Sequence, residues 1–117
     1  MSKSYTTITN DVSKALITLR KGIPETMQGF SAMSKSALTP GALPALEKEL
    51  IALAISVASR CDACIGFHVK ALIRLGVSRE QFMETLGVCT YMGGGPSVMY
   101  AADAMRAYEE FTAGKTE

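Results

Sequence analysis

The sequence predicts an all-α fold of about six helices in one domain spanning residues 1–117. Apolar residues recur three and four positions apart through most of the chain, a spacing that places side chains on one face of a helix. Capping and helix-breaking residues divide this pattern, and no stretch alternates apolar and polar residues as a half-buried strand would. A chain of 117 residues with 48% hydrophobic content can form one modest core.

The first third of the chain predicts two helices. Residues 1–9 are polar and rich in Thr and Ser, so we expect a loose N-terminal arm there. Asn10 or Asp11 can cap a first helix that continues through residue 20. Pro24 suits the first turn of a second helix. The apolar faces expected for these helices are Val12, Ala15, Leu16 and Leu19 in the first, and Met27, Phe30, Met33 and Leu38 in the second.

A third helix follows a predicted turn at residues 39–41 and can open at Pro44. Residues 50–58 of this helix are apolar on nearly every side, and a helix that is apolar all round is buried all round. We therefore expect either the central helix of the domain or a helix sandwiched between subunits. Glu49 lies at the edge of this apolar run.

Three further helices complete the prediction. Ser59 can cap a fourth helix over residues 60–75, because Ser59 and Asp62 have the spacing of a capping box. A fifth helix starts at residue 78 and ends at the Gly-Gly-Gly-Pro stretch, and a last helix covers residues 97–111. The side chains expected to face inward are Ala63, Cys64, Phe67, His68, Ala71, Leu72 and Leu75 in the fourth helix, Phe82, Leu86, Cys89 and Met92 in the fifth, and Met99, Ala102, Met105 and Phe111 in the last.

Charge and composition exclude several classes of protein. The formal net charge is +1 and the basic residues are scattered, so we expect no nucleic-acid partner. The apolar run at residues 50–58 is too short to span a bilayer, which needs about 20 residues, and the N-terminus lacks the apolar core of a signal peptide. Three cysteines form no secreted disulfide framework, so we expect a reducing cytoplasm. A charge near zero with positive mean hydropathy favours self-association.

The strongest chemical signal is a Cys-x-x-Cys motif followed by the single histidine. Cys61, Cys64 and His68 lie three and four residues apart and would share one face of a helix. Cys61 would sit in the first helical turn, where free N–H groups favour a thiolate, and His68 can accept the proton of Cys64. The spacing also allows the two cysteines to close a disulfide. The strip therefore contains a nucleophile, a resolving thiol and a base.

Glu49 is a candidate to orient His68. If the third and fourth helices pack antiparallel around Ser59, Glu49 lies ten residues before that corner and His68 nine after it, which places both at similar depth. A buried carboxylate needs a partner, and a catalytic base works better when a third group orients it. The alternative interpretation makes Glu49 an ordinary first-turn acid in solvent.

Structural roles are also open for several of these residues. His68 can be a satisfied core residue, and Cys61, Cys64, His68 and Cys89 can be considered as zinc ligands. Structural zinc usually has two close pairs of ligands and this chain has one pair, so we expect no metal and no other cofactor. Cys89 is expected to be a small core hydrophobe. The glycines before Pro96 predict a bend, or a close approach of backbone to the active-site pocket.

These residues together resemble a known family. Glu49, Cys61, Cys64 and His68 at this spacing are similar to the alkylhydroperoxidase D family, within the carboxymuconolactone decarboxylase-like superfamily. The surrounding sequence supports the resemblance over roughly residues 25–111, namely Glu-Lys-Glu-Leu-Ile-Ala-Leu-Ala before the motif, Gly-Phe-His within it and Gly-Gly-Pro after it. The resemblance implies an all-helical fold that assembles as a homotrimer or homohexamer.

The resemblance also implies a thiol-dependent peroxidase with an antioxidant role. Cys64 would attack a hydroperoxide, Cys61 would resolve the product to a disulfide, and His68 and Glu49 would relay the proton. A dithiol donor, such as a lipoyl group on a partner protein, would then reduce the disulfide. Ala63 stands where the best-studied members have a second histidine.

Two other functions fit the same residues. One is a lactone decarboxylase of the parent superfamily, an activity that does not need the cysteine pair. The other is a redox-sensing or zinc-binding protein that is not an enzyme, in which oxidation of Cys61 and Cys64 changes assembly or the pair holds a metal.

Overall fold

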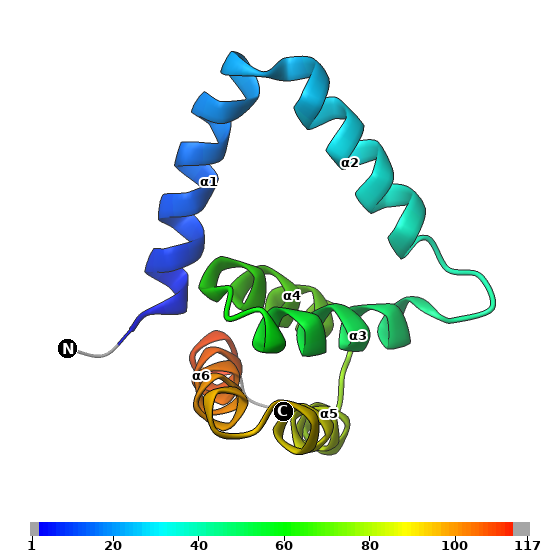
Figure 1. The fold of residues 1–117 in the computed structure, drawn as a ribbon, viewed down its shortest axis with the longest axis vertical. Helices are drawn as coiled ribbons and strands as arrows, with labels where there is room; N and C mark the ends of the chain where they lie inside the picture. The colour runs from blue at the N-terminus through cyan, green and yellow to red at the C-terminus, as the bar shows by residue number, and fades with distance from the viewer. Residues whose placement is uncertain (1–2, 114–117) are drawn as a thin grey trace.

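The computed structural model describes residues 3–113, and in that part of the chain it has six helices and no strand (Figure 1). The predicted fold class is therefore confirmed. Pro24 opens the second helix as predicted, and Ser78 and Gln81 form a capping box at the start of the fifth. The helices are α1 (Tyr5–Gly22), α2 (Pro24–Leu38), α3 (Ala45–Ala58), α4 (Asp62–Arg74), α5 (Arg79–Gly93) and α6 (Gly95–Thr112).

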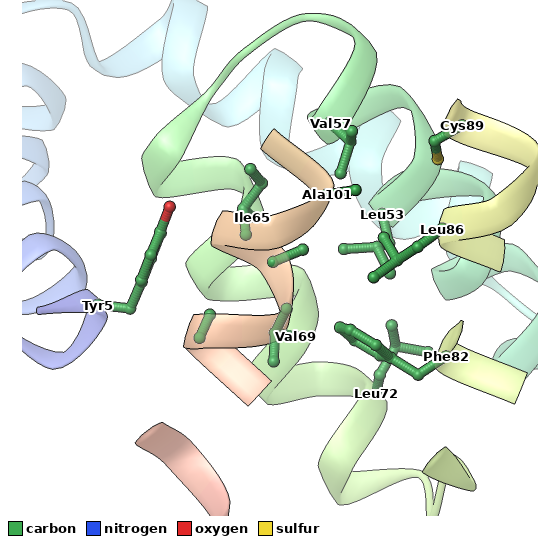
Figure 2. Packing of buried hydrophobic residues seen from close by; sticks show 12 residues of the cluster. Tyr5, Leu53, Val57, Ile65, Val69, Leu72, Phe82, Leu86, Cys89 and Ala101 are labelled. Atoms are coloured by element: carbon green, nitrogen blue, oxygen red, sulfur yellow. The ribbon is translucent and has the colours of Figure 1, made fainter. Parts of the chain in front are cut away.

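The core lies where α3, α4, α5 and α6 meet, and α3 packs against each of the other three (Figures 1 and 2). This confirms α3 as a central helix. It is not buried all round within one chain, because Ile51 is 48% exposed and Ile55 is 62% exposed. The face that α6 turns to the core consists largely of small side chains, which let that helix approach closely. The buried apolar residues of α3 to α6 are Leu53, Val57, Ile65, Val69, Leu72, Phe82, Leu86, Cys89, Ala101, Ala104 and Ala107.

The N-terminal segment is not a loose arm, and that prediction is wrong for the residues described. The first helix begins at Tyr5, and Ser4 caps it by accepting a hydrogen bond from the backbone N–H of Thr7 at 3.2 Å. Tyr5 and Thr9 are fully buried, and the Thr9 hydroxyl is satisfied by donating to the Tyr5 carbonyl at 2.9 Å. The helix therefore starts before the predicted caps, and residues 1–2 lie outside the described residues.

The first helix lies very close to α4 at Gly66. A Cβ atom built at this glycine would stand 2.5 Å from the Thr9 methyl carbon and 3.4 Å from the Tyr5 ring. Any larger side chain would therefore push α1 away from α4. The contact is reinforced by the Lys70 ammonium, which donates to the Thr9 hydroxyl at 2.9 Å. Gly66 thus allows the N-terminal segment to reach the region around the Cys-x-x-Cys motif.

Glu110 of α6 fixes the other side of the same segment. Its carboxylate accepts hydrogen bonds from the Ser4 hydroxyl at 2.7 Å and from the backbone N–H groups of Tyr5 and Thr6 at 2.7 and 3.2 Å. Burial acts to raise the pKa of Glu110, but these hydrogen bonds outweigh it and lower the pKa to about 2. An acidic side chain at a helix N-terminus is also favoured by the helix dipole.

We expect this carboxylate to make stability depend on pH. Its folded pKa lies below the ordinary value of 4.5, so its stabilising effect is complete above pH 4.5 and is lost as pH falls toward 2. The difference in unfolding free energy between wild type and Glu110→Gln should be constant near neutral pH and shrink in that acidic window. Urea unfolding followed by circular dichroism at several pH values measures it. The exposed neighbour Glu109 gives a control, since Glu109→Gln should leave the acid profile unchanged.

The inward faces of α4, α5 and α6 differ in part from the prediction. In α4 the buried side chains are Ile65, Val69 and Leu72, while Leu75 is 45% exposed. In α5 the prediction is confirmed except for Met92, which is 75% exposed. In α6 the core face is shifted: Ala101, Ala104 and Ala107 are buried, whereas Met99 and Ala102 were expected to face inward. Both of those side chains are exposed, and Met105 and Phe111 are half-buried.

The C-terminal half of α1 extends away from the helical core, and α2 runs back toward it and meets α3 only near its own C-terminal end (Figure 1). No residue of α2 is buried, although the predicted apolar face is present in the sequence. This part of the chain exposes Ile17, Leu19, Ile23, Phe30 and Met33 by 42% to 61%. Among residues 3–113, no helix combines the length and hydropathy needed to cross a membrane.

Candidate functional site

A tight corner between α3 and α4 positions the Cys-x-x-Cys motif. The Arg60 N–H donates to the Val57 carbonyl and the Cys61 N–H donates to the Ser56 carbonyl, both at 3.1 Å, so α3 ends in a Schellman motif. Arg60 takes the left-handed position of that motif with φ of 59°, where glycine is usual. The next helix therefore begins directly after this corner.

Cys61, and not Ser59, caps α4. Its backbone is extended and its Sγ accepts a hydrogen bond from the Cys64 N–H at 3.2 Å. The predicted capping box at Ser59 is wrong, because the Ser59 hydroxyl donates back to the Ile55 carbonyl at 2.8 Å and ends α3. Cys61 is therefore at the N-cap of α4, not in its first turn. The helix dipole and free N–H groups still favour a negative sulfur there.

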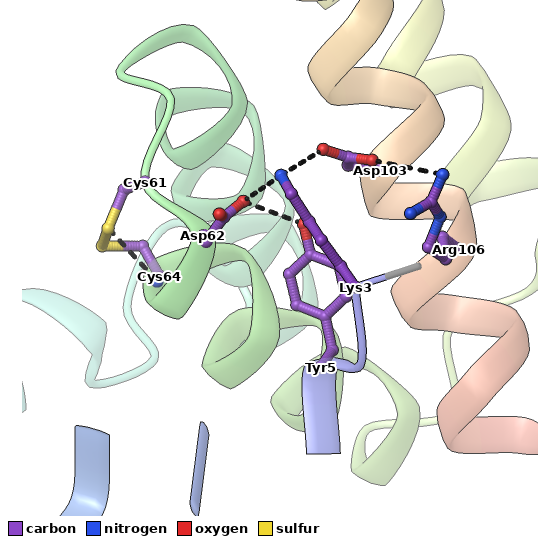
Figure 3. Close-up of polar contacts among 7 residues, drawn as sticks. All are labelled: Lys3, Tyr5, Cys61, Asp62, Cys64, Asp103 and Arg106. Atoms are coloured by element: carbon purple, nitrogen blue, oxygen red, sulfur yellow. Dashed lines mark hydrogen bonds and ion pairs between the residues drawn. A yellow bond between two sulfur atoms is a disulfide. The ribbon is translucent and has the colours of Figure 1, made fainter. Parts of the chain in front are cut away.

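The sulfur atoms of Cys61 and Cys64 are joined in a disulfide, and their Cα atoms are 5.2 Å apart (Figure 3). Cys89, in contrast, is a free thiol, 6% exposed in the core, as predicted. Burial raises the pKa of Cys89, which keeps this thiol protonated. Among residues 3–113, no three His, Cys, Asp or Glu side chains are grouped closely enough to hold a metal ion.

Glu49 and His68 are hydrogen-bonded, as the antiparallel packing of α3 and α4 predicts. The His68 Nδ1 atom lies 2.7 Å from Oε1 of Glu49. The Glu49 side chain is 12% exposed and the His68 side chain 29% exposed. An ionised carboxylate can only accept a hydrogen bond, so Nδ1 carries a hydrogen and donates the hydrogen bond to Glu49. The neutral ring then has its free lone pair on Nε2, where it can accept a proton from another group.

Cys64 and His68 share a face of α4 one helical turn apart, but that face is not the core face. Both residues are half-buried, while Ile65 and Val69 point into the core. The expectation that Cys64 and His68 face inward is therefore wrong in this respect. The sequence pattern contains two neighbouring apolar strips, and the larger aliphatic side chains occupy the core. Partial exposure suits a redox-active thiol, which needs contact with its reaction partners.

A group of polar residues next to the disulfide was not predicted from the sequence (Figure 3). Asp62 accepts hydrogen bonds at Oδ1 from the Lys3 ammonium and from the Tyr5 hydroxyl, both at 3.0 Å. Lys3 also donates to Asp103 of α6 at 2.7 Å, and its ammonium lies 5.0 Å from the centre of the Tyr100 ring. The hydrogen-bonded partners are 57 to 100 residues apart in sequence, so local spacing gave no signal for them.

Comparisons with known protein sequences match the chain to one family and to several relatives. The profile of the carboxymuconolactone decarboxylase family matches residues 24–107. An uncharacterized protein of Cupriavidus necator is 35% identical over 113 residues, which cover 97% of this chain and 100% of that protein. The alkyl hydroperoxide reductase AhpD of Mycobacteroides abscessus is 29% identical over 87 residues, which cover 74% of this chain but only 44% of AhpD.

Two solved structures resemble this chain along nearly its whole length. A carboxymuconolactone decarboxylase family protein from Legionella pneumophila, determined in its apo form, is 50% identical with a TM-score of 0.92, over 95% of this chain and 99% of that one. The structure of TM1620 from Thermotoga maritima is 26% identical with a TM-score of 0.76, over 94% of each chain. By its sequence and its six-helix fold, the chain belongs to the carboxymuconolactone decarboxylase family.

Proposed function

We propose that this protein is a thiol-dependent alkylhydroperoxidase. The proposal rests on one observation: the Cys61–Cys64 pair lies at the start of the same helix that presents His68, whose ring is held by Glu49. A redox-active pair one turn from an oriented base is the arrangement that peroxide reduction by a thiol requires. The similarity to AhpD, which covers less than half of that protein, supports the same activity.

In the proposed reaction Cys64 is the attacking thiol. Nε2 of His68 takes the proton from Cys64, and the thiolate attacks the terminal oxygen of the hydroperoxide. The O–O bond breaks, the sulfur becomes a sulfenic acid, and the leaving alkoxide receives the proton from His68 to form an alcohol. Glu49 accepts the Nδ1 hydrogen bond throughout and stabilises the imidazolium that forms between the two transfers.

Cys61 completes the oxidative half of the cycle. Its thiolate attacks the sulfenic sulfur of Cys64, the S–O bond breaks, and the hydroxide leaves as water after taking up a proton. A dithiol donor, such as a lipoyl group carried by a partner protein, then reduces the disulfide by two thiol–disulfide exchanges and becomes a disulfide itself. Such a cycle suits a reducing cytoplasm.

The direct test is consumption of an alkyl hydroperoxide by the purified protein with dihydrolipoamide as reductant. We expect steady turnover that depends on both reagents, with one dithiol oxidised for each hydroperoxide reduced. No turnover with any simple alkyl hydroperoxide would contradict the proposal. Decarboxylation of a carboxymuconolactone by the Cys61→Ser/Cys64→Ser variant would instead favour the lactone decarboxylase. Near-stoichiometric zinc in the purified protein would favour the non-enzymatic alternative.

We further propose that the chain works as a homotrimer or homohexamer. The exposed apolar side chains of α1 and α2 are one support. A second is a pair of apolar grooves of about 340 and 270 Å³ between α3 and α5, which share Ala54 and Val88. Light scattering during gel filtration should give three or six times the chain mass of 12.5 kDa. Phe30→Glu/Met33→Lys should yield a smaller species, and a wild-type monomer would refute the assembly.

A further inference from the structure

The Asp62 carboxylate is the negative charge nearest in sequence to both sulfurs of the redox pair. Asp62 directly follows Cys61, and it precedes Cys64 by two residues. A free carboxylate at this position would repel a thiolate on either cysteine and favour the protonated thiol. A thiol in its protonated form is a poor nucleophile. The motif therefore contains a residue that opposes its own proposed chemistry unless the charge of that residue is compensated.

The structure compensates that charge from the N-terminal segment. Lys3 and Tyr5 both donate to Oδ1 of Asp62 at 3.0 Å, and Figure 3 shows the carboxylate directed toward them and away from the disulfide. Tyr5 is fully buried, so its hydroxyl is fixed in place. Burial and the hydrogen bond to Asp62 raise the pKa of Tyr5, which keeps the phenol protonated as a donor.

Lys3 is itself held by α6. Its ammonium donates to Asp103 at 2.7 Å and lies over the Tyr100 ring, and its side chain is only 35% exposed. The hydrogen bond to Asp103, opposed by burial, raises the pKa of Lys3 and keeps it charged. The contacts of Lys3 with α6 thus keep a cation on Asp62.

We propose that Lys3 and Tyr5 are positioning residues for the redox pair: they hold the Asp62 carboxylate away from the sulfurs and neutralise its charge, which keeps a thiolate accessible when the pair is reduced. This inference depends on the thiol chemistry of the proposed function but not on peroxide as the substrate. The charged or titratable groups around the motif include Asp62 and His68 on α4, Arg60 directly before Cys61, Glu49 on α3, Lys3 and Tyr5 from the N-terminal segment, and Tyr100, Asp103 and Arg106 on α6.

The test is titration of the reduced protein, with thiolate measured by its absorbance near 240 nm and by the rate of iodoacetamide alkylation. Lys3→Gln and Tyr5→Phe leave Asp62 less compensated, so the thiolate fraction at a given pH should fall. Asp62→Asn removes the opposing charge, so the fraction should rise. We expect changes of roughly threefold to tenfold, the size that one partly screened charge produces.

The opposite signs separate this role from a purely structural one. Lost packing alone would lower the melting temperature. It would not lower the thiolate fraction in Lys3→Gln and raise it in Asp62→Asn. In Lys3→Gln/Asp62→Asn the effect of the lysine should largely disappear, because it acts through Asp62. Arg79→Gln is the matched control, because it removes an exposed cation of α5 that pairs with Glu109 of α6. It should leave the thiolate titration unchanged.

Titration curves for Lys3→Gln, Tyr5→Phe and Asp62→Asn that coincide with wild type, in proteins that remain folded, would overturn the proposal. So would shifts of one common sign. The measurement uses no peroxide, so a protein that fails to turn over hydroperoxide still gives a clear result here. Failure of the proposed function and failure of this inference are therefore distinguishable.

Discussion

Cys64→Ser should abolish peroxide turnover, with kcat/KM falling by more than about 10³-fold, because a serine hydroxyl cannot replace a thiolate as nucleophile toward a peroxide. The fold should be retained, since Cys64 is half-buried and contributes no large core side chain. Turnover is measured with an alkyl hydroperoxide and dihydrolipoamide, and circular dichroism checks the helical content.

The control for this variant is Cys89→Ala, which removes the third thiol from the core without touching the redox pair. It should keep wild-type turnover with some loss of stability. If Cys64→Ser retains the wild-type rate while Cys61→Ser loses it, then Cys61 is the attacking thiol. That outcome would follow if the N-cap position outweighed the neighbouring base.

Glu49→Gln should lower kcat/KM by about 10²-fold, the contribution typical of an oriented general base. The glutamine amide can donate to Nδ1 of His68, which would move the ring proton to Nε2 and leave no lone pair to accept the proton of Cys64. An amide also gives no charge to stabilise an imidazolium. Steady-state kinetics over a range of pH measures the loss.

Glu47→Gln provides the matched control, because Glu47 lies two residues earlier on α3 and is exposed. It should leave turnover unchanged. Equal rates for Glu49→Gln and wild type would remove the proton relay from the mechanism, whatever the role of the cysteines. A comparable loss in His68→Asn, and no further loss in the double variant, would show that the two residues act as one unit.

Local sequence signals predicted most helix boundaries, because those ends depend on residues close in sequence. Pro24 opens α2, and Ser78 stands at the predicted start of α5. The start of α1 was missed because Tyr5 and Thr9, which form its first buried positions, carry polar groups. In the folded protein the hydroxyls of both residues are hydrogen-bonded. These partners cannot be identified from neighbouring residues.

The orientation of helix faces was harder to predict. Met92 and Met99 are large and apolar, yet they are 75% and 63% exposed, while Ala104 and Ala107 are fully buried. Hydropathy identifies a face that avoids water but not the surface that covers it, which can belong to the same chain or to another copy. Close packing of two helices also favours small side chains such as alanine, and these contribute little to a hydropathy pattern.

The candidate site was predictable where it depended on helical register. The pairing of Glu49 with His68 followed from their similar distances to the corner between two antiparallel helices. The corner was expected at Ser59, but its backbone geometry was not predicted, because Arg60 takes a position that glycine normally fills. The compensation of Asp62 by Lys3 was not predicted either, because it depends on how α1 docks, with Gly66 allowing the close approach.

The sulfur of Cys61 belongs to the covalent bridge and also secures the first turn of α4. Removing it therefore has two effects that one substitution can confuse. Alanine at this position removes the disulfide and the cap, and the lost cap should lower the free energy of unfolding by about 1 kcal/mol. Serine removes the disulfide but keeps an acceptor oxygen in a favoured capping position. Mutagenesis of this motif should use serine to test chemistry, and the difference between the two variants reports how much the architecture depends on a single atom.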